Sequence, residues 1–198
     1  MQYDMVFEGG GAKGMAFVGA LQEIENRQHT PARLLGASAG AIMATFLAAG
    51  YNSKEMADAL NETEADQPVF LGFLETPQKP SPEELQNSAF RQLLRDVNLR
   101  IVPDVLEDKI DDAITNQLAS SPLTSRIFSF IDKGGFYAAN RFLGWLREKL
   151  NSGIYPLERG AYGKGKVRAF GDMNLLEYYQ ATGVDLSLVG SDTTDAGL

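Results

Sequence analysis

Residues 3–14 have the sequence YDMVFEGGGAKG, in which a short apolar segment runs directly into a glycine-rich loop. The residues after the loop are apolar at helical spacing, so this stretch predicts a strand, a loop and a helix. A second apolar segment follows at 33–37, and the alanine-rich stretch at 39–49 predicts a second helix that stops at Gly50. Strands joined by crossover helices lie parallel. We therefore expect a βαβα unit in an α/β fold, with a layered, parallel-rich sheet flanked by helices.

The remainder of the chain is predicted to be mainly helical before it returns to the sheet. The run Ser81-Pro82-Glu83-Glu84 combines a capping box with a proline at the first helical position, which predicts a helix start. Apolar spacing predicts further helices at 53–63, 105–118 and 140–150. Residues 185–190 have the alternation of a core strand.

These elements are expected to form a single domain over residues 1–198. Its parts would be a βαβα core at 1–52, a mainly helical insertion at 53–165 and a return to a core strand at 166–198. A chain of 198 residues, of which 44% are hydrophobic and 22% charged, has the size and composition of one globular core.

The charge and residue usage exclude several classes of protein. The formal net charge is -8 and the basic residues are scattered, whereas phosphate binding needs clustered Lys and Arg, so no nucleic-acid partner is expected. The absence of cysteine fits a reducing compartment. The first residues have no signal-peptide pattern, and the uncharged run at 34–51 is rich in Gly, Ala and Ser, which favours a buried helix over a membrane span. We expect a cytoplasmic protein, with secretion by another route left open.

Residues 36–40 match the G-x-S-x-G pattern of a nucleophile elbow, in which a serine lies on a tight turn from a strand to a helix. The matching residues are Gly36, Ala37, Ser38, Ala39 and Gly40. The turn brings the serine backbone against its neighbours, so a Cβ at either glycine is expected to clash. Ser38 would lie at a helix N-terminus, where the dipole favours negative charge. Five small residues also occur where a helix packs closely on a sheet, so this pattern alone leaves a packing role open.

A glycine loop precedes this serine, at the end of the first predicted strand. It consists of Gly9, Gly10, Gly11, Ala12, Lys13 and Gly14. Adjacent parallel strands end at the same edge of a sheet. We therefore expect the amides of Gly10 and Gly11 to face a carbonyl under attack by Ser38, as an oxyanion hole requires. Lys13 is expected either to steady the loop or a phosphate headgroup, or to be a solvated surface residue.

The same loop matches the G-x-G-x-x-G pattern of dinucleotide-binding folds. The second predicted strand ends without the Asp or Glu that holds a ribose there, and Met15 stands where a Walker loop has its lysine. A nucleotide site therefore stays a minor alternative. We expect neither a cofactor nor a metal.

His29 is the one histidine of the chain. The first helix runs away from the glycine loop and the second strand returns to Ser38, so His29 is expected at the opposite edge of the sheet. This placement excludes a Ser-His-Asp triad within the chain. Serine chemistry would then need a carboxylate or a lysine as its base.

The two motifs, in this order and spacing, resemble the opening of patatin-like phospholipases, in which a strand, a G-G-G-x-[KR]-G loop, a helix and G-x-S-x-G follow one another. The resemblance continues beyond residue 131, in a segment similar to the family's "kGGLy" run, in the helix that follows it and in a late strand. These parts are Lys133-Gly134-Gly135-Phe136-Tyr137, the helix with Trp145-Leu146, and residues 185–192. Between residues 51 and 131 the resemblance is weak.

The resemblance implies an α/β-hydrolase-related architecture with a helical insertion, and a lipid acyl hydrolase that uses a Ser-Asp dyad. Ser38 would be the nucleophile and the glycine loop the oxyanion hole. The substrate would be a phospholipid or another acyl lipid, with contact to a membrane surface. Apolar segments at 69–74 and 128–131 are expected either to line an acyl groove or lid, or to pack in the core.

The chain departs from the family's pattern at the aspartate. Family members carry this residue in a D-G-[GA] motif on a later loop, and the sequence has no such motif. Asp192 and Asp195 are candidate bases within the chain. We expect the 198 residues to be the N-terminal part of a longer domain, in which a C-terminal segment or a second chain completes the site. The alternative to an enzyme is a catalytically silent patatin-like module with a binding or regulatory role.

Overall fold

The computed structural model describes residues 1–96 and 122–190 of the chain. The chain forms two compact units, one made of Met1–Val69 with the residues from Gly144 onward, and the other of Phe70–Leu143. The first unit contains the parallel sheet, and the second is mainly helical. The division into core, insertion and return strand at residues 52 and 165 stays a prediction.

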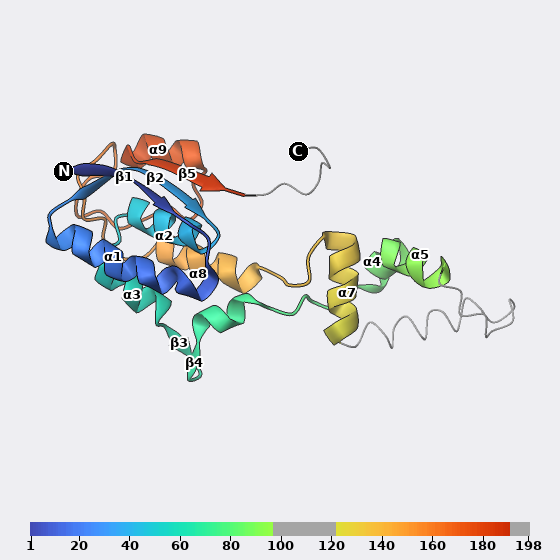
Figure 1. Ribbon diagram of the computed structural model, residues 1–198. Helices are drawn as coiled ribbons and strands as arrows, with labels where there is room; N and C mark the ends of the chain where they lie inside the picture. Colours follow the sequence, from blue (N-terminus) through green and yellow to red (C-terminus); the bar gives the residue numbers. More distant parts are fainter. Residues whose placement is uncertain (97–121, 191–198) are drawn as a thin grey trace, which may run out of the picture. The chain divides into compact units, whose positions relative to one another are not determined.

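A three-stranded parallel sheet lies at the centre of the first unit (Figure 1). Its strands, in spatial order, are β1 (Gln2–Phe7), β2 (Thr30–Ala37) and β5 (Asp185–Val189). Phe7 pairs with Gly36, and Ala37 pairs with Val189, so all three strands end at the same edge. The predicted α/β fold with a parallel sheet and flanking helices is confirmed.

The first unit also contains helices. They are the 3-10 helix η1 (Gly11–Gly14), α1 (Met15–Asn26), α2 (Ala39–Ala48), α3 (Ser53–Leu60), α8 (Asn140–Leu150, whose first residues belong to the second unit) and α9 (Leu175–Thr182). Gly50 follows the C-terminal end of α2 with a φ of 76°, at the position where the sequence predicts that this helix stops. Among the helices that the structure describes, none has the length and apolar character needed to cross a lipid bilayer.

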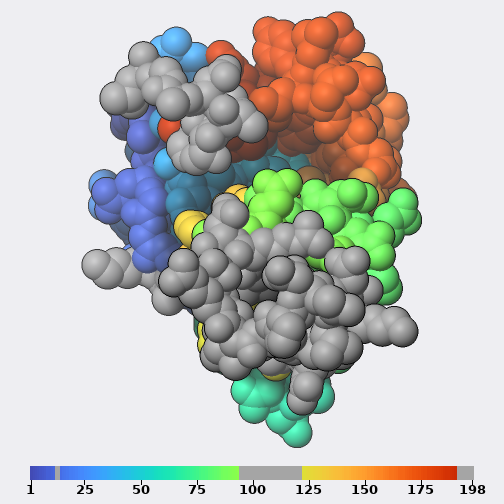
Figure 2. All heavy atoms as spheres, turned by 90° about the vertical axis from the view of Figure 1, so that its right-hand side faces the viewer, coloured from blue at the N-terminus to red at the C-terminus, as the bar shows by residue number. Residues whose placement is uncertain are grey.

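The side chains of the strands alternate between the two faces of the sheet, as the period of a strand requires. Met5 and Phe7 of β1 and Leu34 of β2 are buried, whereas Val6 and Leu35 point to the other face and are exposed. Helix α2 contacts all three strands, and Figure 1 shows α1, α2 and α3 on the same side of the sheet. Figure 2 shows the blue N-terminal segments and the orange segment around α9 on opposite sides of the first unit.

Aromatic side chains pack against α2 and beyond its C-terminal end in the core. Phe46 of α2 stacks on Tyr51, with 4.8 Å between ring centroids, and contacts Trp145 of α8 at 5.5 Å. A neighbouring cluster is formed by Tyr155, Tyr162, Phe170 and Tyr178. Burial is the main cause that raises the pKa of the Tyr178 hydroxyl well above its usual range, and the nearby Tyr155 raises this pKa further.

The second unit has a small helical core of its own. Among its described residues, the helices are η2 (Val69–Phe73, which begins one residue earlier), α4 (Pro82–Gln86), α5 (Ala89–Asp96) and α7 (Pro122–Lys133). Helix α4 begins with the predicted capping box, in which Ser81 and Glu84 each accept a hydrogen bond from the other's amide. Phe128 and Ile131 pack in the core with Leu85 and Phe90, whereas much of the segment at 69–74 is exposed.

Two predicted boundaries are wrong by three residues. Strand β2 begins at Thr30 and not at Arg33, because the Thr30 amide donates to the Met1 carbonyl oxygen at 3.1 Å and extends the parallel ladder. Helix α3 ends at Leu60, short of Thr63, because β3 (Thr63–Glu64) pairs with β4 (Gln67–Pro68) in an antiparallel hairpin. The helix predicted at 105–118 lies outside the described residues.

Candidate active site

Two glycines flank Ser38 at places where no side chain fits. A Cβ at Gly36 would lie 2.4 Å from the Gly40 carbonyl oxygen, and a Cβ at Gly40 would lie 2.2 Å from the carbonyl oxygen of Phe7. Both distances are far below van der Waals contact. The N-terminus of α2 therefore packs directly on the backbones of β1 and β2, which only glycine permits.

Ser38 itself has a strained backbone conformation. It is the N-cap residue of α2, with φ 51° and ψ -123°, a region that non-glycine residues rarely adopt. Its side chain makes no capping hydrogen bond to the helix amides, although serine is a preferred cap. The hydroxyl therefore lies at the positive end of the α2 dipole without a capping role.

Ala37 and Ala39 complete the turn on either side of this serine. Ala37 is the last residue of β2 and pairs with Val189, and Ala39 is the first residue of α2. The pentapeptide thus forms the strand–turn–helix arrangement that its sequence pattern predicts.

The glycine loop lies beside Ser38. A Cβ at Gly9 would be 3.2 Å from the Cβ of Ser38 and 4.0 Å from its Oγ, and a Cβ at Gly14 would be 3.4 Å from that of Ala39. Gly11 has a φ of 56°, which favours glycine. The structure thus brings the two sequence motifs together at the edge where β1 and β2 end. Gly10 links β1 to η1, and the backbones of Ala12 and Lys13 belong to η1.

His29 lies at the other end of β2, as predicted. Its Nδ1 is 3.4 Å from the Met1 amino group, and its ring contacts the Tyr3 ring at 5.1 Å. Strand β2 separates it from Ser38 by roughly 23 Å, at about 3.3 Å per residue.

We therefore expect His29→Ala to leave the hydrolytic rate within about twofold of the wild-type value. The reason is distance, because a general base must reach its proton directly or through one water. Steady-state hydrolysis of a short-chain ester at several pH values measures the effect, and a hundredfold loss would show that His29 reaches the serine.

The described residues do not include either aspartate that the sequence offers as a base. Asp192 and Asp195 both lie outside the described residues. Over residues 1–96 and 122–190, no group of three or more His, Asp or Glu side chains could hold a metal ion.

Arg168 is a buried residue that the sequence analysis does not single out. It lies in a Gly- and Lys-rich segment with no apolar periodicity, so no sequence signal marks it. In the structure it is 2% exposed and contacts the chain at the far end of α2 from Ser38.

The fold and this site define an α/β protein whose parallel sheet presents a strained serine and a glycine loop at the carboxyl edge of its strands. The family model of patatin-like phospholipases matches residues 5–175, so the chain belongs to the patatin-like phospholipase family. Patatin-like phospholipases are in general lipid acyl hydrolases.

One curated relative shares part of the chain. "Uncharacterized protein YqhO" of Bacillus subtilis (strain 168) is 43% identical over 67 residues, which are 34% of this chain and 23% of that protein. The chain thus matches less than a quarter of the relative's length. No solved structure matches the chain significantly.

Proposed function

We propose that this protein hydrolyses carboxylic esters of lipids, with Ser38 as the nucleophile. The observation that carries the proposal is the strained backbone of Ser38, whose side chain accepts no capping hydrogen bond. The glycine loop lies so close to it that a Cβ added at Gly9 would be 3.2 Å from the Ser38 Cβ. A strained residue persists only where its surroundings hold it, and such residues cluster at active sites. Membership of the patatin-like phospholipase family supports a phospholipid or related acyl lipid as the substrate.

The reaction begins when Ser38 Oγ attacks the ester carbonyl carbon and its proton passes to a base. The Gly10 and Gly11 amides donate hydrogen bonds to the oxyanion that forms, and the N-terminus of α2 stabilises the same negative charge. The C–O bond to the leaving alcohol then breaks, the alcohol takes the proton, and an acyl-serine remains. Attack by water, deprotonated by the same base, releases the fatty acid and restores the serine.

The base in this proposal is an aspartate. Asp192 and Asp195 are the candidates within the sequence, and a C-terminal segment or a second chain is the other source. Replacing each aspartate by asparagine separates these sources. Loss of serine reactivity in one variant identifies the base, and full reactivity in both assigns it to another segment or chain.

The test is covalent labelling of the full chain with a lipid-like fluorophosphonate, which traps an activated serine. We expect a single adduct by intact mass, on the peptide that contains Ser38. Ser187→Ala is a matched control, because Ser187 is an exposed serine of the same sheet that pairs with Leu35 and has no assigned role. This variant should label like the wild type.

Labelling only when the chain is extended through the next Asp-Gly motif would show that the base lies in the added segment. Failure of both chains to label would favour the silent binding or regulatory module. The nucleotide alternative makes a different prediction, namely that an adenine or flavin nucleotide raises the melting temperature in a concentration-dependent way. An adduct on a serine other than Ser38 would contradict the proposed nucleophile.

Gly9→Ala is expected to slow labelling of Ser38 by about tenfold or more. Its Cβ would lie 3.2 Å from the Ser38 Cβ, so the serine or the loop must shift by a few tenths of an ångström, and small misplacements are costly to catalysis. Stability should fall by only about 1 kcal/mol. Gly163→Ala is the control, since nothing lies within 4 Å of the added Cβ. Equal labelling rates in the two variants would show that the glycine loop does not affect the reactivity of Ser38.

A further inference from the structure

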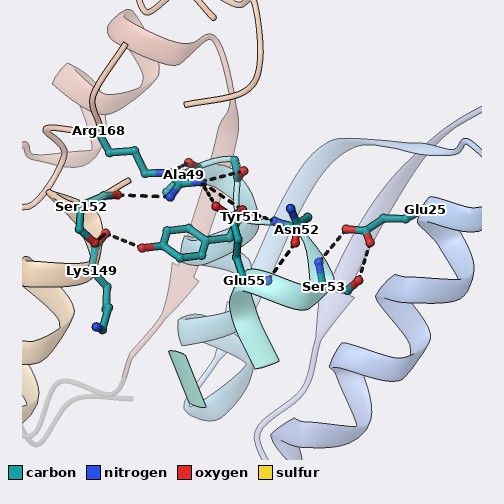
Figure 3. Close-up of polar contacts among 10 residues, drawn as sticks. Glu25, Ala49, Tyr51, Asn52, Ser53, Glu55, Lys149, Ser152 and Arg168 are labelled. Carbon is teal, nitrogen blue, oxygen red and sulfur yellow. Dashed lines mark hydrogen bonds and ion pairs between the residues drawn. The ribbon is translucent and has the colours of Figure 1, made fainter. Parts of the chain in front are cut away.

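Arg168 is almost completely buried and uses its whole guanidinium group. Its Nε donates to the Ala49 carbonyl oxygen at 2.9 Å, and its Nη1 donates to that of Ser152 at 3.2 Å. Its Nη2 donates to the Gly50 carbonyl oxygen at 3.1 Å and also contacts both carboxylate oxygens of Glu55, at 3.2 and 3.3 Å. Figure 3 shows this guanidinium at the centre of the polar contacts.

The contacts with Ala49 and Gly50 fix the C-terminal end of α2. The last carbonyls of a helix have no partner within the helix, and they carry the negative end of its dipole. A buried guanidinium donates hydrogen bonds to these carbonyl oxygens, and its positive charge interacts favourably with this end of the dipole. The Tyr51 ring, with its centroid 3.9 Å from the guanidinium carbon, covers the same group.

Glu55 extends these contacts to α3. It forms a capping box with Asn52, in which the Asn52 amide donates to Glu55 Oε2 at 3.0 Å and the Glu55 amide donates to Asn52 Oδ1 at 2.8 Å. The next residue, Ser53, donates its amide and its hydroxyl to Glu25, at 2.8 and 2.5 Å. Glu25 lies in the last turn of α1.

One set of contacts therefore joins the C-terminal ends of α1 and α2, and we call it the polar clasp. It consists of Glu25, Asn52, Ser53, Glu55 and Arg168 (Figure 3). The opposite end of α1 follows the glycine loop, and the opposite end of α2 directly follows Ser38. The clasp thus connects the two helices that carry the two halves of the candidate site.

We propose that Arg168 is a positioning residue that sets the distance between Ser38 and the glycine loop through α1 and α2. This inference rests on the proposed function of Ser38. A helix of ten residues is a stiff rod of about 15 Å, so a shift at its C-terminal end moves its N-terminal end as well. The loop and the serine are closely packed, since a Cβ added at Gly9 would lie 3.2 Å from the Ser38 Cβ, and a shift of about 1 Å here changes the geometry of attack substantially.

Arg168→Lys is the main test. Lysine keeps the positive charge, but its single ammonium group cannot reach Ala49, Gly50, Ser152 and Glu55 together. Fluorophosphonate labelling and the kcat of ester hydrolysis should each fall at least about tenfold, with KM within about twofold. Arg27→Lys is the matched control, because Arg27 pairs with Glu23 at an exposed site on α1, and it should change nothing.

Glu25→Gln tests the α1 side without altering the contacts to α2. Glutamine keeps the shape of the side chain but replaces the charged carboxylate, which accepts two hydrogen bonds from Ser53, by a neutral amide. We expect labelling to slow about threefold or more, again through kcat. All rates are measured well below each variant's melting temperature, so that the folded fraction does not enter.

Hydrogen exchange of the full chain gives a readout that does not depend on activity. The proposal predicts faster exchange at 9–14 and 36–42 in Arg168→Lys, in addition to the region around 49–55. Faster exchange at 49–55 alone, together with an unchanged labelling rate, would reduce Arg168 to a local structural role. Absence of labelling both in this chain and in a chain extended through the next Asp-Gly motif would contradict the proposed function, and the exchange pattern would still decide the positioning role.

Discussion

Ser38→Ala is expected to reduce hydrolysis of lipid esters by at least about a thousandfold and to abolish the fluorophosphonate adduct. The variant removes the one atom that attacks the carbonyl, while the glycine loop and the α2 dipole remain in place. Initial rates with a phospholipid and with a soluble ester measure the loss. Residual activity above about a tenth of the wild-type value would mean that another residue is the nucleophile.

The same variant should stay folded, which separates chemistry from structure. The Ser38 side chain makes no capping hydrogen bond, so its removal costs no cap, and alanine has to adopt the same strained φ of 51°. We expect the free energy of unfolding to change by about 1 kcal/mol or less. Retained binding of a non-hydrolysable lipid analogue, measured by calorimetry, would show that the substrate site is intact.

Gly40→Val is expected to destabilise the first unit by at least about 3 kcal/mol and to eliminate activity. The Cβ would lie 2.2 Å from the Phe7 carbonyl oxygen and 2.6 Å from that of Glu8, so α2 must move away from β1. Urea unfolding followed by the emission of Trp145 measures the effect, because this one tryptophan packs on Phe46 of α2.

Gly19→Ala is the matched control for that substitution. Gly19 lies in the middle of α1, and nothing outside the helix lies within 4 Å of an added Cβ. Alanine should stabilise the helix by about 0.5–1 kcal/mol, because it lowers the conformational entropy of the unfolded chain. If Gly40→Val were as stable as this control, the close packing of α2 on β1 would be contradicted.

Short-range patterns were enough to predict the elements around the site. The alanine-rich stretch at 39–49 predicts α2, which spans Ala39–Ala48, and the Ser81–Glu84 capping box places the start of α4. The motif order predicts that the glycine loop and Ser38 meet at one edge, and the register of Phe7 with Gly36 agrees. These features follow from local backbone preferences and from the parallel pairing of neighbouring strands, so they can be derived from the residues alone.

Other features depend on segments that are distant in the sequence. No local signal marks Arg168 as buried, because its partners Ala49, Gly50 and Glu55 precede it by more than a hundred residues. The end of α3 at Leu60 is likewise decided by the hairpin that follows it.

The sequence by itself determined the α/β class, the family resemblance and the identity of the candidate nucleophile, since each depends on residues close together in the chain. Only the tertiary structure decided how closely Gly9 lies to Ser38 and how tightly Gly36 and Gly40 pack on neighbouring backbones, and which contacts hold the far end of α2. The physical reason is that close packing and buried charge depend on which backbones meet in space. The local composition of the sequence does not specify these tertiary contacts.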